Sequence, residues 1–255
     1  MKKSDIEVTY VNHCGSDLSV VNAARVSFHK ESDMVWKSRE PTEEDRKNNP
    51  FPEYPIERIE YYGLDDKDEK LIQYLARNKH FSPFNHSFIT LRVKAPIFVA
   101  RQLVKHKFMP WNEVSRRYVD EEPEFYFPDK WRARAENVKQ GSSDDRCEAM
   151  YEEFDDELFG PSPSAAECVE WGIEEALRSY EMVLKHGAAP EQARMVLPQN
   201  MMTEWWWSGT LGAYADMLKL RLDPHTQYES RIVAQKAYVM IKELFPISIK
   251  ALLND

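Results

Sequence analysis

Cysteine is scarce in this chain, which has three cysteines in 255 residues. Cys14, Cys147 and Cys168 form no C-x-x-C pair, and their number is odd. This pattern excludes a disulfide framework and a four-cysteine zinc site, and it is typical of a reducing compartment. Cys147 and Cys168 have acidic neighbours, which disfavour a thiolate. Cys14, beside His13, is the best candidate for a nucleophile, but we do not expect it to act as one.

Glycine is scarce as well, with eight residues, and none of them forms a G-x-G-x-x-G or Walker pattern. A nucleotide-like ligand must therefore be held by side chains and helix ends. Long apolar runs are missing too: no window approaches the roughly eighteen apolar residues of a membrane span, and the first residues do not form a signal peptide. We expect a soluble, cytoplasmic protein without a membrane partner.

Positive charge is in the minority, with 34 Lys and Arg against 43 Asp and Glu, a net charge of -9. This balance argues against a duplex DNA binder, whose affinity rests on many phosphate contacts along a basic face. It also disfavours an RNA-binding protein that would use the basic segment and the tryptophans. A small anionic ligand held in a cleft remains compatible with the composition.

Hydrophobic periodicity predicts the elements of one large domain, since 42% apolar content can bury a sizeable core. Strands are expected at Ile6–Val11 and Ser87–Lys94, where apolar residues alternate with others. Capping residues, prolines and 3.6-residue periods predict helices at residues 17–25, 65–78, 96–108, 164–186, after 190, 202–222 and 224–244.

Two segments are interpreted as insertions, near 31–60 and 120–163. The first, from Glu31 to Asn49, is charged and proline-rich and is expected to be an exposed loop. The second is acidic, with one short helix expected around 144–159.

The most unusual segment is Gln102–Tyr118, which gathers basic side chains in an acidic chain: QLVKHKFMPWNEVSRRY. On a helix from Pro96 to about Phe108, Gln102, Lys105 and His106 would share one face. Pro110 would end that helix, and the following WNEVSRRY is expected to be a connector. The charge predicts a site for a phosphate-bearing ligand; the alternative is a solvated helix face.

Other chemistry is less well supported by the sequence. Ser115 has no identifiable base, so a hydrogen-bonding role is favoured over nucleophilic attack. His225 and Glu229 are four residues apart but lack the H-E-x-x-H form, and His80 and His86 form no such motif either, so we expect no metal site. Three consecutive tryptophans, 205–207, would point in different directions on a helix, so at least one must pack in a core or an interface.

Five segments carry a resemblance to a known family. Lys105-His106-Lys107, then seven residues, then Ser115 within NEVSRRY, resembles the signature of the flavin-dependent thymidylate synthases, in which the triplet is usually Arg-His-Arg. Four further segments resemble that family in order and spacing: SDLSVVNAARVSF, HFSPFNHSFITLRVKAPIFVARQ, ARMVLPQNMMTEWWW and LKLRLDPHTQYESR. The resemblance covers nearly the whole chain apart from the two insertions. It implies an α+β fold, with a mixed antiparallel sheet packed with several long helices, and a homotetramer that shares FAD between subunits.

The resemblance also implies the residues of the site. Arg221 matches the arginine that polarises the uracil ring and is the implied catalytic residue. The positions matching contacts to the substrate dUMP are Gln102, Lys105, Glu113, Ser115, Arg116, Arg117, Arg194 and Arg221. The positions matching contacts to FAD are His80, Ser82, Lys105, His106, Lys107, Glu113, Thr210, Leu211, Gly212, Asp216 and His225.

The implied reaction is the reductive methylation of dUMP to dTMP, with methylenetetrahydrofolate as one-carbon donor and NADPH as reductant through FAD. A guanidinium aimed at the N3 and O2 region of uracil would stabilise the negative charge that develops on the ring. No enzyme thiol is then required, which agrees with the lack of a convincing cysteine nucleophile.

The chain departs from the family pattern at several positions. Lys105 and Lys107 keep the charge of the usual arginines but lose their planar fork. Asn85 stands where the family usually has glutamate. Thr210-Leu211-Gly212 and Asp216 replace a more polar, asparagine-containing pattern, and Asp216 would bring an acid near an anionic cofactor. These departures leave open an alternative, a catalytically impaired homologue that still binds nucleotide or flavin.

Overall fold

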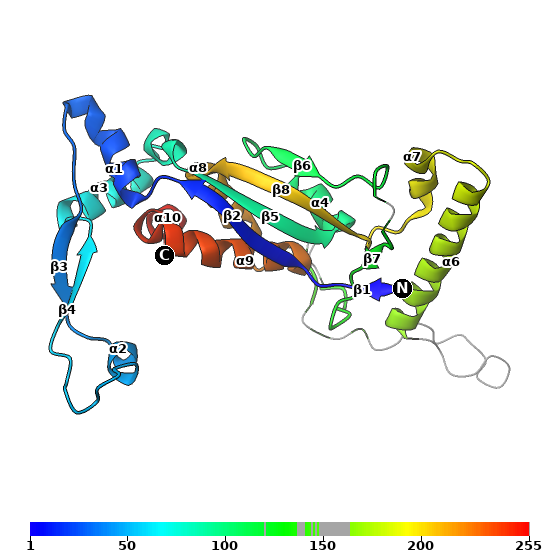
Figure 1. Cartoon of the computed structure of the whole chain (residues 1–255), viewed down its shortest axis with the longest axis horizontal. Helices are drawn as coiled ribbons and strands as arrows, with labels where there is room; N and C mark the ends of the chain where they lie inside the picture. Colours follow the sequence, from blue (N-terminus) through cyan, green and yellow to red (C-terminus); the bar gives the residue numbers. More distant parts are fainter. Residues whose placement is uncertain (120, 137–140, 144, 146, 148–163, 255) are drawn as a thin grey trace. The chain divides into compact units, whose positions relative to one another are not determined.

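The computed structural model describes residues 1–119, 121–136, 141–143, 145, 147 and 164–254 (Figure 1). The chain forms two compact units. The first unit comprises Met1–Asn12, Ile89–Gly209 and Ala213–Met240, and the second comprises His13–Phe88, Thr210–Gly212 and Ile241–Asp255. No helix of the described ranges has the length and hydropathy that a membrane span requires.

A four-stranded sheet has the order β2 (Glu7–Cys14), β5 (Phe88–Pro96), β8 (Met202–Thr210) and β6 (Trp111–Glu113). In β5 the apolar residues Ile89, Leu91 and Val93 are fully buried, which confirms the strand that their alternation predicts. A shorter pair, β1 (Lys2–Lys3) and β7 (Glu124–Phe125), is parallel, whereas β6 and β8 are antiparallel. Helices and a mixed set of strands confirm the α+β class.

The helix predicted over residues 202–222 is wrong in its first half. Met202–Thr210 is strand β8, and only Leu211–Arg221 is helical, as α8. Trp205 and Trp207 are buried at 1% and 0% exposure, while Trp206 between them is 52% exposed. This two-residue alternation is that of a strand, which aromatic residues favour. Tyr214 of α8 donates its hydroxyl to the main-chain oxygen of Trp207 at 2.6 Å.

The helix predicted over residues 96–108 is also shorter than expected, because α4 ends at Leu103 (Ile97–Leu103). Lys105 and His106 therefore lie in the turn after the helix, not on its face. Phe108 has a left-handed backbone (φ 60°) and is 83% exposed. The predicted connector WNEVSRRY begins with a strand, since β6 pairs with β8 in the register Asn112 to Trp206.

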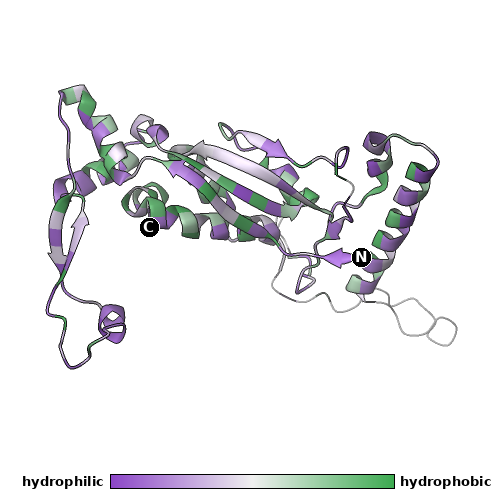
Figure 2. Cartoon of the chain, in the orientation of Figure 1, coloured by the Kyte–Doolittle hydropathy of each residue, from purple (hydrophilic) through white to green (hydrophobic). Residues whose placement is uncertain are grey.

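The long helix α6 (Ala165–Lys185) confirms the prediction for residues 164–186. Ser164 and Glu167 form a capping box at its start. Apolar and hydrophilic residues alternate around the helix (Figure 2), and Ile173 and Tyr180 pack with Phe125 in a buried cluster. The segment after Pro190 is only the short helix α7 (Pro190–Ala193) and the 3₁₀ turn η3 (Arg194–Val196). Helix α9 (Tyr228–Leu244) begins four residues later than Pro224, the predicted start.

The second unit contains the predicted helices α1 (Asp17–Arg25) and α3 (Asp66–Arg77), with α10 (Pro246–Leu253). Ser16 and Asp65 occupy the N-cap positions of α1 and α3. Asp17, 7% exposed, accepts hydrogen bonds from the main-chain N–H groups of Ile247 and Ser248 at the start of α10. Two 3₁₀ turns, η1 (Val26–Phe28) and η2 (Ser82–His86), also lie in this unit.

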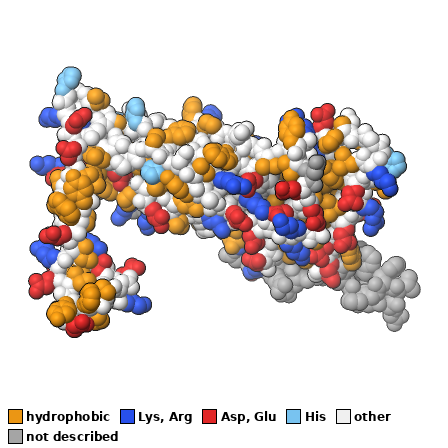
Figure 3. All heavy atoms as spheres, viewed as in Figure 1, with side chains coloured by type: hydrophobic (Ala, Val, Ile, Leu, Met, Phe, Trp, Pro, Cys, Tyr) orange, Lys and Arg blue, Asp and Glu red, His pale blue; other side chains and the backbone are white. Residues whose placement is uncertain are grey.

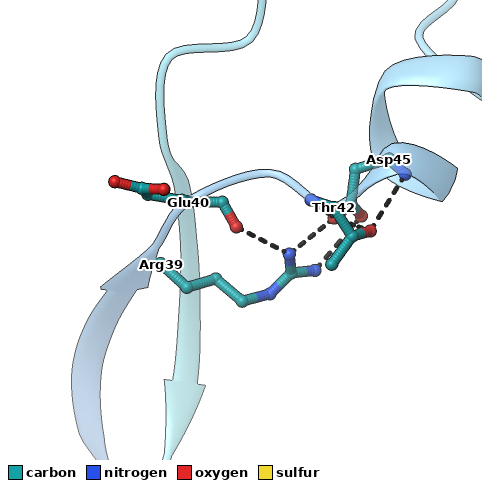
Figure 4. Close-up of polar contacts among 4 residues, drawn as sticks. All are labelled: Arg39, Glu40, Thr42 and Asp45. Carbon is teal, nitrogen blue, oxygen red and sulfur yellow. Dashed lines mark hydrogen bonds and ion pairs between the residues drawn. The ribbon is translucent and has the colours of Figure 1, made fainter.

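The segment expected to be an irregular loop contains regular structure. Strands β3 (Val35–Arg39) and β4 (Ile59–Gly63) form an antiparallel ribbon, and α2 (Glu43–Lys47) lies in the connection between them. Thr42 and Asp45 form a capping box, and Arg39 donates to both carboxylate oxygens of Asp45 (Figure 4). These local bonds order a charged sequence that has no apolar period.

The expected exposure of this segment is confirmed. Hydrophobic side chains gather on its surface (Figure 3), including Trp36 at 73% and Tyr62 at 57% exposure. The short helix expected around 144–159 falls mostly outside the described residues.

Candidate functional site

Arg221, at the end of α8, is held by the turn that follows α4. Its Nε donates to Nε2 of His106 at 3.0 Å, and its Nη2 donates to the main-chain oxygen of Gln102 at 3.1 Å. Gln102 lies in the last turn of α4, where carbonyl groups lack partners within the helix and attract cations. The structure thus brings together three residues expected in the site, although Arg221 is 115 positions from His106 and 119 from Gln102 in the sequence.

Gln102 is itself fixed by the start of α9. Its side-chain amide donates to Gln227, and its Oε1 accepts from the hydroxyl of Ser230 at 3.1 Å. Ser230 is fully buried, and Gln227 donates in turn to Glu229 at 3.1 Å. Both polar atoms of the Gln102 side chain are therefore engaged inside the protein.

Electrostatics at this cluster favour a neutral histidine beside a charged arginine. Burial, and then the nearby Arg221 guanidinium, lower the pKa of His106 to about 4. Burial also lowers the pKa of Arg221, which stays protonated because an arginine begins so far above neutrality. The ring of His106 packs against Trp207, with centroids 6.3 Å apart. A neutral imidazole can accept the hydrogen bond that Arg221 donates.

The basic segment otherwise points its charge to solvent. Lys105 and Lys107 are exposed and make no hydrogen bond or ion pair within the described part of the chain. Arg117 donates from Nε to the hydroxyl of Ser115 at 3.0 Å. Arg116 donates to the main-chain oxygen of Glu121 at 2.7 Å, and its buried Nε has no partner among the described residues.

Glu113 is held by two hydrogen bonds that the sequence does not predict. Thr203 of β8 donates to Oε1 at 2.8 Å, and the indole of Trp111 donates to Oε2 at 2.9 Å. Trp111 stacks on Trp205, with centroids 4.3 Å apart. The carboxylate is therefore oriented by the sheet, because β6 pairs with β8 at this register.

Three further expected residues are not joined to the Arg221 cluster. Arg194 is exposed in η3 and donates to the main-chain oxygen of Glu191 at 3.3 Å. Asp216 is exposed on α8, 3.9 Å from Lys219. His225 is exposed and bonds to Asp223. Across the described ranges, no hydrogen bond or ion pair links these residues to His106 or Arg221.

The remaining expected cofactor residues lie in the second unit. His80 and Ser82 line a cavity of about 800 Å³ between α1, α3 and η2. Its other lining residues include four basic side chains, Arg25, Lys30, Lys67 and Lys70. Arg25 is paired with the buried Asp68. A cavity of this charge fits an anionic ligand.

Thr210 and Gly212, at the end of β8 and the start of α8, meet Asn85 of η2. The hydroxyl of Thr210 donates to Oδ1 of Asn85 at 2.8 Å. A Cβ atom at Gly212 would lie 2.5 Å from the same oxygen. Leu211 donates its N–H to the main-chain oxygen of Ser87. The unusual residues at positions 85, 210 and 212 thus form one contact set.

A family model described as "Thymidylate synthase complementing protein" matches residues 9–247. The chain belongs to this family. Its resemblance to flavin-dependent thymidylate synthases is confirmed by relatives of that name. A protein of Thermus thermophilus is 33% identical over 245 residues, 94% of this chain and 73% of that protein. One of Kosmotoga olearia is 32% identical over 249 residues, 97% of this chain and 90% of that protein.

A solved structure agrees with this family assignment. A UMP/dUMP methylase, PolB from Streptomyces cacaoi, crystallised with 5-Br dUMP, has a TM-score of 0.72 and 27% identity. The match covers 100% of this chain and 97% of that one. This member of the thymidylate synthase complementing protein family therefore shares its fold with a protein that binds a uracil nucleotide analogue.

Sequence reasoning missed the residues that support the expected site residues in this family member. Thr203, Gln227 and Ser230 hold Glu113 and Gln102 from 90 or more positions away. No motif marks them, because single threonine, glutamine and serine residues are common in any sequence. The available signal is β-strand alternation in residues 202–210, which places Thr203 and Trp205 on one face of the sheet, the face that also carries Glu113 of the paired strand β6.

Proposed function

We propose that this chain is a cytoplasmic, homotetrameric flavin-dependent thymidylate synthase. It methylates dUMP reductively to dTMP, with methylenetetrahydrofolate as one-carbon donor and NADPH as reductant through FAD. The observation that carries the proposal is the Arg221 guanidinium, anchored by His106 and Gln102 beside the basic segment. The names of the relatives support the same reaction.

Arg221 has the role closest to the chemistry. Two of its N–H groups are engaged by the protein, which leaves three for a ligand. A half-buried guanidinium stabilises negative charge on a uracil ring more strongly than one in open water. The activation of the ring therefore needs no thiol from the three cysteines.

The phosphate of dUMP is bound by the exposed cations of the first unit. Lys105, Arg117 and Arg194 are exposed, and the partly buried Arg116 lies beside Arg117 in the chain. Charge-assisted hydrogen bonds from such groups are the usual means of binding phosphate where no glycine-rich loop exists. Ser115 orients Arg117 and attacks nothing.

FAD supplies hydride-transfer chemistry when it is bound. The residues present fit such a group, because the cavity beside His80 and Ser82 carries Lys30, Lys67 and Lys70, besides the Arg25 that pairs with Asp68, and such cations suit a pyrophosphate. Lys107 and His106 belong to the same set of proposed flavin contacts, as do Glu113, Thr210, Leu211, Gly212, Asp216 and His225. Their task is to bind and orient the cofactor.

The first experiment is a visible absorption spectrum of the purified protein, followed by a dUMP titration. We expect a yellow protein with a flavin spectrum that oxidises NADPH faster when dUMP is present and forms dTMP when methylenetetrahydrofolate is added. Arg221→Ala should abolish dTMP formation and leave flavin bound. Arg178→Ala, in an exposed pair with Glu175, is the matched control.

The outcomes separate the proposal from its alternative. A colourless protein that cannot be loaded with FAD would overturn the proposal. A protein that binds FAD and dUMP but forms no dTMP would instead support the impaired homologue, in which Lys105 and Lys107 do not replace two arginines. The molar mass measured by size-exclusion chromatography with light scattering tests the proposed tetramer.

A further inference from the structure

The two hydrogen bonds of Arg221 occupy one edge of its guanidinium. Nε and Nη2 form the edge that faces away from Nη1, and these two atoms donate to His106 and Gln102. Arg221 makes no third hydrogen bond with any described residue. The edge formed by Nη1 and Nη2 is therefore available for a planar acceptor.

We propose that His106 is a positioning residue for Arg221: it acts as a neutral hydrogen-bond acceptor that, with the main-chain oxygen of Gln102, fixes the plane of the guanidinium. The effect on dUMP rests on the proposed function. The hydrogen bond itself rests only on the geometry of the first unit.

The residue type at position 106 suits this role. Lysine or arginine has no acceptor atom, and a carboxylate would neutralise the charge that Arg221 directs at its ligand. A neutral imidazole accepts at Nε2 and leaves the charge on Arg221 intact. The lowered pKa of His106 agrees with the neutral form. Trp207, packed against the ring, holds the imidazole in place.

The second acceptor is equally constrained. Gln102 cannot rotate away from Arg221 without breaking its side-chain bonds to Gln227 and Ser230 of the α9 region. Both acceptors therefore lie at the end of α4 and in the turn after it, and the residues around the start of α9 hold this part of the chain in place. An arginine held at two atoms by a fixed turn loses little further freedom when it meets a ligand.

A pair of substitutions separates the acceptor from the bulk of the ring. His106→Gln keeps an acceptor oxygen near the position of Nε2, and His106→Met fills similar space without one. We expect His106→Met to weaken dUMP binding about tenfold or more, the value of one hydrogen bond to a charged group. His106→Gln should weaken dUMP binding less than His106→Met does, because it keeps an acceptor for Nε of Arg221.

A double-mutant cycle tests whether His106 acts through Arg221. In an Arg221→Lys background the Nε donor is gone, so His106→Met should change dUMP affinity less than about twofold. Calorimetry gives the dUMP affinity, and kcat and KM are measured with flavin content as a check. Additive effects, or equal losses in His106→Gln and His106→Met, would show that His106 does not position Arg221.

Crystal structures of the ligand-free variants provide a readout that does not depend on the reaction. The Arg221 guanidinium should keep its place in His106→Gln and leave it in His106→Met. If the unaltered protein fails to bind dUMP while these structures behave as expected, the proposed function fails and the positioning role stands. A guanidinium that stays in place in His106→Met would overturn the positioning role.

Discussion

At the scale of single residues, a side chain at Gly212 would have to displace the side chain of Asn85. A Cβ atom there would meet Oδ1 of Asn85 at 2.5 Å, and that oxygen already accepts a hydrogen bond from Thr210. We expect Gly212→Ala to lower the free energy of unfolding by about 1 kcal/mol, because Asn85 must move away and lose its hydrogen bond with Thr210. Denaturant unfolding measures the change.

Two controls make this prediction specific. Asn85→Gly should restore most of the stability of Gly212→Ala, because it removes the oxygen that clashes. Gly172 lies in α6, and outside the backbone of that helix and the neighbouring residues no atom lies within 4 Å of an added Cβ, so Gly172→Ala should stabilise by roughly 0.5–1 kcal/mol. Loss of stability in Gly172→Ala but not in Gly212→Ala would contradict the geometry at Asn85.

Ser115 provides a second prediction at this scale. Its hydroxyl accepts from Nε of Arg117, so its removal frees Arg117 without deleting a reacting atom. We expect Ser115→Ala to raise KM for dUMP by roughly three- to tenfold and to leave kcat within about threefold. Steady-state kinetics check this. A variant that binds dUMP normally yet forms no dTMP would show that the hydroxyl takes part in the chemistry.

The candidate site was predictable from sequence only where residue type and order carry it. Arg221, His106 and Gln102 were expected in the site, and the structure joins them. The hydrogen bonds that join them were not predictable. They depend on a turn after Leu103, where the sequence pattern predicts that the helix continues. Thr203 and Ser230 act by position alone, and position comes from tertiary packing.

At the scale of elements, strand β8 shows why a helix was predicted and why it does not form. Trp205, Trp206 and Trp207 are three consecutive apolar residues, which fit a strand period and a helix period equally well. Pairing with β5 and β6 favours the strand, because it gives hydrogen-bond partners to the main-chain N–H and C=O groups. It also stacks Trp205 on Trp111. The long helix α6 was predictable because its capping box and period agree.

Trp206 and Trp207, adjacent residues of β8, give a prediction at the scale of this strand. Trp207 is fully buried, and its ring meets His106 and Tyr214. Trp207→Ala should cost about 3–5 kcal/mol of unfolding free energy through the cavity it creates. Trp206→Ala, next along the strand and half exposed, should cost less than about 1 kcal/mol. Equal losses in chemical denaturation would contradict the strand alternation.

At the scale of the whole molecule, His106 links stability to pH. Its folded-state pKa of about 4 lies below the ordinary value, so the unfolded chain binds more protons between about pH 4 and 6.5. The contribution of His106 is therefore fully present above about pH 6.5 and is lost as pH falls towards 4. Unfolding of the unaltered chain and of His106→Gln, compared across this range, isolates it: the difference should grow with pH and level off near neutrality. A flat difference would contradict the lowered pKa.

The anchoring of Arg221 also bears on the order in which function and structure fail. The guanidinium depends on a turn 115 positions earlier in the chain and on the segment that begins α9. Opening of either segment, or of the end of α8 that carries Arg221, would release the arginine while the sheet and α6 stay folded. The activity is therefore lost as soon as the least stable of these local structures opens. The circular dichroism signal changes only when most of the helices unfold. On heating, dTMP formation should therefore be lost at a lower temperature than the helical circular dichroism signal.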